Sequence, residues 1–410
     1  MHICAPSSMH HRLFFDVTEL AGFDKGTGIQ RVTRALLQAL EKSSPADWAV
    51  VAVRGDGVTG RFTIATSPTD RPAPEQPVSM LETPIEPAEG DIFLSADLAY
   101  NITASLRSEL ARFRLQGVGV YFVVHDLIPL MYPEWFEGTN AWFEGNDYLK
   151  LFNFWFDCVS EEGDGLVCIS ESVRKEVEAW RTRHQPKRVD VAQLGYFHLG
   201  SDITESIPSS GLPPNAADVL ASLKSSTTFL MVGTLEPRKG HELALDAIET
   251  LWAQGHEVTL VFVGRAGWKV ERLVARLENH PRLGKQLFWL DGISDEYLRE
   301  VYMTSAALLA LSLAEGFGLP LVEAAHFRLP LIVRNIQVFR EICHEAATYF
   351  NGSSSDELQV LLNKWLKDLD AGHCHYPDNM EVLSWSDSAQ QLMSAVGKMR
   401  GNEFFWKAEK

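Results

Sequence analysis

The chain has 410 residues, of which 46% are hydrophobic and 22% are charged, a composition typical of a folded globular protein. Because this length exceeds what one hydrophobic core usually serves, two domains are expected. The 37 Lys and Arg against 54 Asp and Glu give a net charge of −17, which argues against nucleic acid as the main partner, since phosphate backbones are bound by clustered cations.

The sequence also indicates where in the cell the protein is expected. Residues 1–17 lack the charged region, apolar stretch and cleavage site of a signal peptide, and no apolar run approaches the roughly 18 residues of a spanning helix. The five cysteines are scattered without a CxxC pair, which suits a reducing cytoplasm. We expect a cytoplasmic protein. Arg107, Arg112 and Arg114 follow a helical pattern that allows weak peripheral contact with the cytoplasmic face of the inner membrane.

Short apolar runs with little alternation recur along the chain, separated by stretches of helical periodicity. Such runs predict strands covered on both faces, and their alternation with helices predicts an α/β fold with parallel sheets. In chain order the predicted strands are 12–17, 48–53, 91–95, 119–124, 165–170, 189–194, 227–233, 257–264, 286–290, 306–311, 329–334 and 347–350.

A break divides these strands into two series. Residues 203–217 are rich in Ser and Pro, a composition typical of a linker. We therefore predict two doubly wound domains, residues 1–202 and 218–385, followed by a C-terminal segment at 386–410. Ligands of such sheets bind beyond the carboxyl ends of the strands, so a cleft between the domains is the predicted site.

Some conspicuous segments have simpler interpretations. The proline-rich residues 64–90 are expected to form a surface loop, with a lid as the alternative. The sequence HCH at 373–375 is interpreted as a loop, because three adjacent residues cannot easily converge on one metal ion. A DxD at 368–370 ends an amphipathic helix and is interpreted as solvated. The aromatic residues of 132–158 allow an acceptor groove, although helical spacing over 148–156 favours core.

A first candidate site lies in the sequence MVGTLEPRKGHELALDAI. A strand is predicted to end at Val232 and a helix to begin near Gly240, so that Arg238 and Lys239 lie where the two meet. Two cations beside a helix N-terminus attract an anion strongly. The pattern predicts a phosphate-binding turn, with a solvated Arg–Lys pair as the alternative.

A second candidate lies in the sequence LAEGFGLPLVEAAHF, where Pro320 suits the first turn of a helix. Gly316 and Gly318 allow backbone N–H groups to approach a phosphate closely. Glu315 and Glu323 each offer two acceptor oxygens, which match vicinal hydroxyls of a sugar or a ribose. The pattern predicts a nucleotide sugar extended between the glutamates. For Glu323 a purely dipole-stabilising carboxylate is the alternative.

Together, VGTLEPRKG and EGFGLPLVEA resemble the donor domain of family-four glycosyltransferases of GT-B architecture, in the mannosyltransferase-like branch of bacterial O-antigen and exopolysaccharide synthesis. The likeness covers about residues 12–395. It implies two Rossmann-like domains that face each other across a deep cleft, with a C-terminal helix crossing back to the first. It also implies that Arg238 and Lys239 hold the donor diphosphate, Glu315 the transferred sugar and Glu323 the ribose.

The resemblance assigns further residues. Ile293 lies in a turn that resembles the segment whose backbone reads the base, and the sequence YFVVHDLIP resembles the family's His–Asp motif, with His125 near the sugar and Asp126 orienting it. Arg31 begins the helix after a glycine loop that closes over the donor phosphates. Core packing is the alternative for His125, and surface capping for Arg31. The implied catalytic residues are Arg238, Lys239, Glu315 and His125; the implied donor-binding residues are Gly26, Gly28, Ile293, Gly316, Phe317, Gly318, Leu319 and Glu323.

The chain departs from the family pattern in two places. The family usually has a small residue or glycine near Arg328 and a glycine near His344. Both positions lie beyond the glutamates, so the departures concern local packing more than chemistry.

The activity implied by the resemblance is retaining, metal-independent transfer of a hexose to a glycan or lipid-linked glycan. Mannose from GDP-mannose is the first choice of donor, with UDP-sugars and others open, and no cofactor is expected. One alternative is a GT-B epimerase or hydrolase, which would need acid–base carboxylates beside the sugar. Another is a catalytically silent nucleotide-sugar-binding scaffold, which would lack phosphate ligands. A dehydrogenase is disfavoured because no GxGxxG follows the first strand.

Overall fold

The structure is a computed structural model that forms two compact units. The first contains residues 1–131, 147–200 and 383–410, and the second contains 132–146 and 201–382. Segment 132–146, which the sequence places in the first domain, thus packs within the second unit. The residues that the structure describes are 11–22, 26–65, 84–139, 145–188, 192–203, 208–401 and Trp406. Most of the proline-rich segment, as well as Trp142 and Phe143, lies outside them.

The first unit is built on a seven-stranded sheet of order β3-β2-β1-β4-β5-β6-β7. All of its pairings are parallel except that of β2 with β3. The strands are β1 His11–Asp16, β2 Trp48–Asp56, β3 Arg61–Ile64, β4 Ile92–Ser95, β5 Gly119–Val124, β6 Gly165–Cys168 and β7 Gln193–Tyr196.

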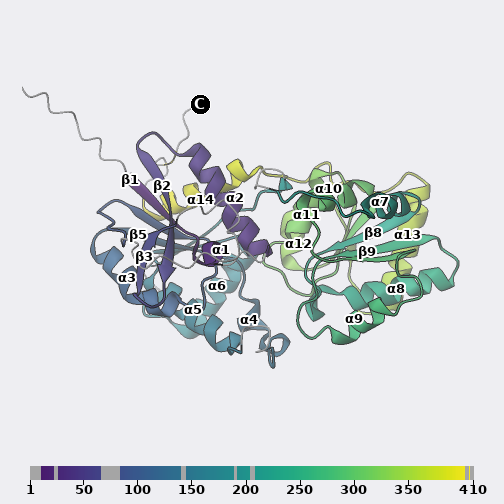
Figure 1. The fold of residues 1–410 in the computed structure, drawn as a ribbon, viewed down its shortest axis with the longest axis horizontal. Helices are drawn as coiled ribbons and strands as arrows, with labels where there is room; N and C mark the ends of the chain where they lie inside the picture. Colours follow the sequence, from purple (N-terminus) through teal and green to yellow (C-terminus); the bar gives the residue numbers. More distant parts are fainter. Residues whose placement is uncertain are drawn as a thin grey trace, which may run out of the picture. The chain divides into compact units, whose positions relative to one another are not determined.

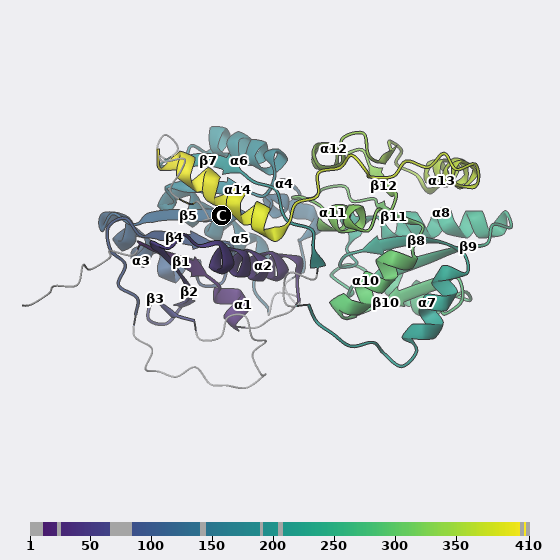
Figure 2. The ribbon, with the colours of Figure 1, turned by 90° about the horizontal axis from the view of Figure 1, so that it is seen from above.

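Helices cover both faces of this sheet, with α2 and α14 on one face and α3 and α5 on the other (Figure 1). The last helix of the chain, α14, packs along α2 and β7 (Figure 2), and Ser388 of α14 donates to the carbonyl of His198 at 2.7 Å. The C-terminal helix therefore belongs to the first unit, as predicted. The helices are α1 Thr18–Gly22, α2 Gly28–Ser43, α3 Thr103–Leu115, α4 Ile128–Met131, α5 Tyr148–Glu162, α6 Glu171–His184 and α14 Trp385–Met399.

The second unit is built on a six-stranded sheet of order β10-β9-β8-β11-β12-β13, in which every pairing is parallel. Its strands are β8 Thr227–Val232, β9 Val258–Val263, β10 Leu287–Leu290, β11 Ala307–Ala310, β12 Leu331–Arg334 and β13 Thr348–Phe350. Its helices are η1 Pro133–Trp135, α7 Ala216–Lys224, η4 Pro237–Lys239, α8 His241–Ala253, α9 Glu271–Glu278, α10 Asp295–Thr304, α11 Leu319–His326, α12 Gln337–Cys343 and α13 Ser355–Asp370.

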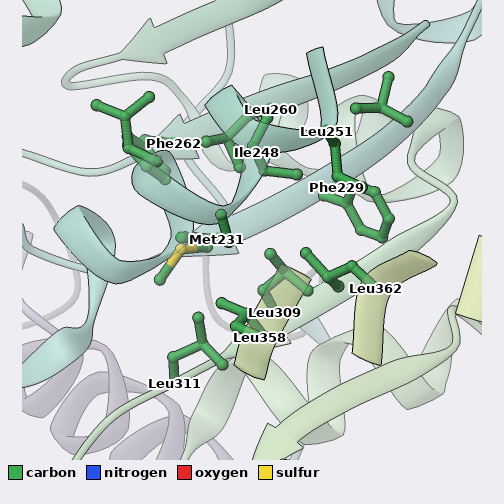
Figure 3. Packing of buried hydrophobic residues seen from close by; sticks show 14 of the residues in the cluster. Phe229, Met231, Ile248, Leu251, Leu260, Phe262, Leu309, Leu311, Leu358 and Leu362 are labelled. Carbon is green, nitrogen blue, oxygen red and sulfur yellow. The ribbon is translucent and has the colours of Figure 1, made fainter. Parts of the chain in front are cut away.

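The core of the second unit lies between its sheet and helices α8 and α13 (Figure 3). Phe229, Phe262 and Leu309 rise from adjacent strands and meet Leu251 of α8 and Leu362 of α13, all of them almost completely buried. Because strands of this sheet are apolar on both faces, they read as continuous hydrophobic runs. This packing holds the carboxyl ends of β8 and β11 side by side.

The predicted α/β fold with two doubly wound parallel sheets is confirmed. In each sheet the order of strands changes direction once. In the first sheet this happens at β1, which lies between β2 and β4, and in the second at β8, which lies between β9 and β11. Ligands of doubly wound sheets bind beyond the carboxyl ends of the strands at such a reversal. The segment predicted as a strand at 189–194 instead has its strand at Gln193–Tyr196, and the antiparallel edge strand β3 was not predicted.

Candidate functional site

Two loops meet where the winding of the second sheet reverses. One leads from β8 through the short helix η4 to α8, and the other leads from β11 to α11. The backbone N–H of Leu313 donates to the carbonyl of Arg238 at 2.8 Å, and the Arg238 guanidinium donates to the carbonyl of Ala314 at 2.7 Å. The loops are therefore held together, which places the two candidate motifs in one site.

An ion-pair cluster occupies this junction. Lys239 Nζ contacts Glu315 Oε1, and Arg238 Nη1 lies 3.2 Å from Glu315 Oε2. The hydroxyl of Ser312 donates to Glu315 Oε1 at 2.7 Å, and Arg238 Nε lies 2.8 Å from Glu236 Oε2. The side chains of Arg238, Lys239 and Glu315 are only 12%, 16% and 13% exposed. The cluster is thus mostly shielded from water, and charges interact more strongly in such a shielded environment than in water.

The two carboxylates of the cluster differ in their electrostatics. Burial alone would raise the pKa of Glu315, but the ion pairs with Lys239 and Arg238 outweigh it and lower the pKa to about 2. Burial raises the pKa of Glu236 above its ordinary value, against the opposing effect of Arg238 and Lys239. At neutral pH Glu315 is therefore an ionised group that only accepts hydrogen bonds.

Glycines occupy the two positions where the loops of the site enter helices. Gly240 has φ +80°, and a Cβ there would lie 2.8 Å from the side chain of Leu311. Gly318 has φ +99°, and a Cβ there would lie 2.9 Å from Leu321. These glycines are the N-cap residues of α8 and α11, and neither helix has a side-chain cap hydrogen bond. Two helix N-termini thus point toward the cluster without a capping side chain, an arrangement suited to an anion.

The second motif glutamate lies on α11. Glu323 is 3% exposed, and its Oε2 accepts a hydrogen bond from the hydroxyl of Tyr302 at 2.7 Å. Tyr302, on α10, stacks on Phe327 with ring centroids 5.5 Å apart. Ile293 immediately precedes Ser294, which caps α10. Gly316 and Phe317 lie in the loop before α11, and Leu319 is its first residue. The donor-side candidates of the second unit thus lie on the loops that follow β8, β10 and β11 and on helix α11, whereas Gly26 and Gly28 lie in the first unit.

Sequence reasoning missed three residues of this region: Glu236, Ser312 and Tyr302. Glu236 stands in the motif EPRKG two residues before Arg238, so its proximity to that cation was a usable signal. Ser312 lies three residues before Glu315. Tyr302 is 21 positions from its partner Glu323 and carries no local signal.

The remaining candidates lie in the first unit. His125 follows β5 and is buried, with Nε2 2.8 Å from the carbonyl of Ala96. Because a carbonyl only accepts, Nε2 carries the proton and Nδ1 is left as an acceptor. Burial lowers the pKa of His125, so the ring is neutral at neutral pH. Asp126 Oδ1 accepts from the backbone N–H of Ile128 at 2.9 Å.

The glycine loop of the first unit precedes α2. Gly26 has φ +67°, and Thr27 caps α2 through a capping box with Gln30. Gly28 is the first residue of the helix, and Arg31 lies in its first turn. This helix start therefore differs from those of α8 and α11 in having its own side-chain cap.

Buried acids that were not among the predicted candidates also gather at the carboxyl edge of the first sheet. The hydroxyl of Ser95 donates to Asp16 Oδ2 at 2.8 Å, and the N–H of Leu20 donates to Asp97 Oδ2 at 2.8 Å. Burial, with the nearby Asp16, raises the pKa of Asp97 to about 7. These contacts fix the loops that surround the end of β5 (Gly119–Val124).

The described residues hold neither a metal-binding group nor a membrane-spanning helix. They contain no group of three or more His, Cys, Asp or Glu side chains arranged to hold a metal ion. Within the same residues, no helix combines the length and apolar character that crossing a membrane requires.

With this geometry in place, comparison with known proteins identifies the domain. Residues 215–376 match the family described as "Glycosyl transferases group 1". The ion-pair cluster lies within the part of the chain that matches this family.

Several of the named relatives are mannosyltransferases. The chain is 38% identical over 390 residues to the serotype-specific mannosyltransferase WbdA of Escherichia coli. This match covers 93% of this chain and 44% of that protein. It is 27% identical over 179 residues to the E. coli O-antigen chain mannosyltransferase B, covering 43% of this chain and 42% of the relative. The match thus spans less than half the length of each of these relatives.

Solved structures support the fold. Sucrose-phosphate synthase from Thermosynechococcus elongatus matches with a TM-score of 0.63 at 16% identity, covering 95% of this chain and 99% of that one. This likeness over nearly the whole chain agrees with the predicted GT-B architecture.

Proposed function

We propose that the chain is a retaining, metal-independent glycosyltransferase that moves a hexose from a nucleotide sugar to a glycan or lipid-linked glycan. The observation that carries this proposal is the convergence of Arg238, Lys239 and Glu315 on one carboxyl edge of a group 1 glycosyltransferase domain. GDP-mannose is the proposed donor, because the relatives are named as mannosyltransferases.

The cations of the cluster would stabilise the leaving diphosphate. When a donor binds, its diphosphate competes with Glu315 for Arg238 and Lys239, and the N-termini of α8 and α11 add backbone N–H donors. Groups fixed before the reaction and aimed at developing charge usually make the largest contribution to catalysis. In this scheme no divalent cation is needed to neutralise the leaving group.

The two glutamates would position the donor at its ends. Glu315, held ionised by its neighbours, accepts hydrogen bonds from hydroxyls of the transferred sugar. Glu323, oriented by the hydroxyl of Tyr302, accepts a hydrogen bond from a ribose hydroxyl. The backbone beside Ile293 would contact the base. In the first unit, the unprotonated Nδ1 of His125 would accept a hydrogen bond from a substrate hydroxyl.

One observation favours a second candidate, a hydrolase or epimerase acting on the nucleotide sugar. Glu236 and Glu315 both contact Arg238, while burial raises the pKa of Glu236 and the ion pairs lower that of Glu315. Two carboxylates with separated pKa values are suited to acid and base roles. This activity would release or isomerise the sugar without an acceptor.

The proposed setting is the cytoplasm, with the acceptor supplied at the cytoplasmic face of the inner membrane. Helix α3 does not provide a free basic surface for such contact. Arg107 contacts Glu161 and Glu162, Arg112 contacts Glu86 and Glu109, and Arg114 contacts Glu162. Because each of these cations is paired, the weak membrane contact expected from them is not part of the proposal.

The test is a donor screen followed by a transfer assay. Since a ligand that binds only the folded protein raises its apparent stability, GDP-mannose is expected to raise the melting temperature more than UDP- or ADP-sugars. GDP release should then require a glycan acceptor. Sugar release or isomerisation with donor alone would instead establish the second candidate, and no melting shift with any nucleotide sugar would refute both.

A further inference from the structure

A recess of about 650 Å³ lies in the first unit, at the edge where the strands of the sheet begin. Its lining residues come from the C-terminal end of α3, the start of β5, the residue before β6 and two loops. Those that carry polar or exposed side chains are Arg114, Leu115, Tyr121, Asp164, Arg188 and Arg400.

This position separates the recess from the proposed sugar chemistry. His125 follows the carboxyl end of β5 (Gly119–Val124), whereas Gly119, at the other end of the same strand, lines the recess. Six residues of strand span roughly 20 Å at about 3.3 Å per residue. Substrates of doubly wound sheets bind at carboxyl ends, so the recess is not the expected acceptor site.

The recess contains more cationic groups than acids to pair them. Arg188 Nη2 lies 2.7 Å from Asp164 Oδ1, whose other oxygen accepts from the N–H of Val120 at 3.0 Å. Arg114 contacts Glu162. Arg400, in contrast, makes no ion pair with any carboxylate in the described part of the chain; its Nη2 donates to the carbonyl of Gly90 at 3.3 Å.

Many N–H donors of these guanidiniums remain unused. Each guanidinium has five N–H donors in a planar arrangement, and the Nε atoms of Arg114 and Arg188 are buried without a hydrogen-bond partner. Leaving a buried donor unsatisfied destabilises the folded protein. A group of three guanidiniums in one recess suits an anion that can accept several hydrogen bonds at once.

Local packing supports the position of Arg400. A Cβ at Gly119 would lie 2.8 Å from Arg400 Nη1, so the glycine allows the guanidinium to lie directly over the start of β5. The side chain of Tyr121 also interacts with Arg400. The rim is apolar on the side of Leu115, which is 90% exposed.

We propose that this recess is a binding site for a phosphate-bearing ligand, separate from the donor site. Planar guanidiniums hold phosphate oxygens in pairs, and three of them line one recess. The ligand is a phosphate or diphosphate group, carried either by a soluble compound or by a lipid headgroup whose hydrocarbon would lie toward Leu115. The proposal does not depend on the sugar-transfer proposal.

The first experiment is calorimetric titration of the full chain with inorganic pyrophosphate. Because Arg238 and Lys239 also attract diphosphate, the titrations use a Lys239→Ala background, which weakens diphosphate binding at the donor site. Adding Arg400→Gln should weaken the remaining binding at least 10-fold. The matched control is Arg183→Gln, since Arg183 is exposed on α6 and donates only to the carbonyl of Ala179.

Thermal melting confirms that each variant is folded before titration. The proposal is overturned if Arg400→Gln and Arg183→Gln bind pyrophosphate equally in the Lys239→Ala background, or if that background binds none. A second, charge-reversing variant, Arg400→Glu, should abolish the binding rather than weaken it.

Co-sedimentation with vesicles distinguishes the two sources of the phosphate. Vesicles of phosphatidylglycerol and phosphatidylcholine are compared with vesicles of phosphatidylcholine alone. Sedimentation that needs phosphatidylglycerol and is reduced by Arg400→Gln, but not by Arg183→Gln, assigns the site to a lipid headgroup. Pyrophosphate binding without such sedimentation assigns it to a soluble phosphate compound.

Discussion

The hydroxyl of Tyr302 donates a hydrogen bond to Glu323 Oε2 at 2.7 Å, and both side chains are almost completely buried. An ionised carboxylate away from water needs such donors. The bond also fixes the orientation of the carboxylate. Tyr302 is therefore a positioning residue for the glutamate proposed to hold the ribose.

Replacing this tyrosine should weaken donor binding more than chemistry. A hydrogen bond to a charged group contributes about 1.5–3 kcal/mol, so Tyr302→Phe should raise the donor KM about 10-fold while kcat changes little. The matched control is Tyr297→Phe, because Tyr297 is buried on the same helix and its hydroxyl has no hydrogen-bond partner. Equal KM values for the two variants would exclude the positioning role.

Loss of a cation from the ion-pair cluster should reduce turnover more strongly than it weakens donor binding. Lys239→Ala should lower kcat about 100-fold or more, because loss of one fixed donor aimed at developing charge commonly has that effect. Lys224→Ala, which removes an exposed lysine at the end of α7, should leave the rate unchanged. Initial rates of GDP release with acceptor present measure both, and turnover near wild type in Lys239→Ala would remove the lysine from the mechanism.

The fold was largely predictable because burial on both faces leaves a continuous apolar signal. Strand β5 coincides with the predicted residues 119–124, since glycine and His125 bound an uninterrupted apolar run. Strand β3 was missed because its short sequence RFTI pairs antiparallel at an edge, where the pattern is weak. The placement of 132–146 depends on contacts such as that of Trp268 Nε1 with the carbonyl of Trp135, 3.1 Å apart, which no local pattern encodes.

The candidate site was predictable to a different extent. Arg238, Lys239 and Glu315 were singled out from turn chemistry, and the structure brings them together. The partner of Glu323 was not foreseen, because Tyr302 reaches it through a tertiary contact from another helix. Sequence patterns indicate where a loop meets a helix, but not which distant hydroxyl holds a carboxylate in place.

The departure from the family pattern at His344 coincides with backbone strain. His344 has φ +45° and ψ −120°, a conformation that glycine adopts far more readily than a residue with Cβ. His344→Gly should therefore raise the free energy of unfolding by about 1 kcal/mol, measured by urea denaturation. His344→Ala is the control, since it removes the imidazole but keeps Cβ. If alanine stabilises as much as glycine, the strain explanation fails.

Stability below neutral pH should depend on His241. This histidine begins α8, is 2% exposed, contacts Phe262, and has no hydrogen-bond partner at either ring nitrogen. Burial, with the nearby Lys239, lowers its pKa from 6.5 to about 3. Between these values the unfolded chain binds a proton that the folded chain does not. The contribution of His241 to stability is thus lost as pH falls below 6.5, by about 1.4 kcal/mol per pH unit.

Unfolding free energies from urea titrations at pH 7.5 and pH 5 measure this effect. His241→Leu keeps an apolar side chain at the position and removes the titrating group, so its stability should fall by about 2 kcal/mol less than that of the wild type over this interval. His375→Leu, at an exposed histidine, should retain the wild-type dependence because it leaves His241 in place. If His241→Leu loses stability on acidification as steeply as His375→Leu, then the folded protein protonates His241 readily, and the burial of its ring without a partner is not what makes the native state sensitive to acid.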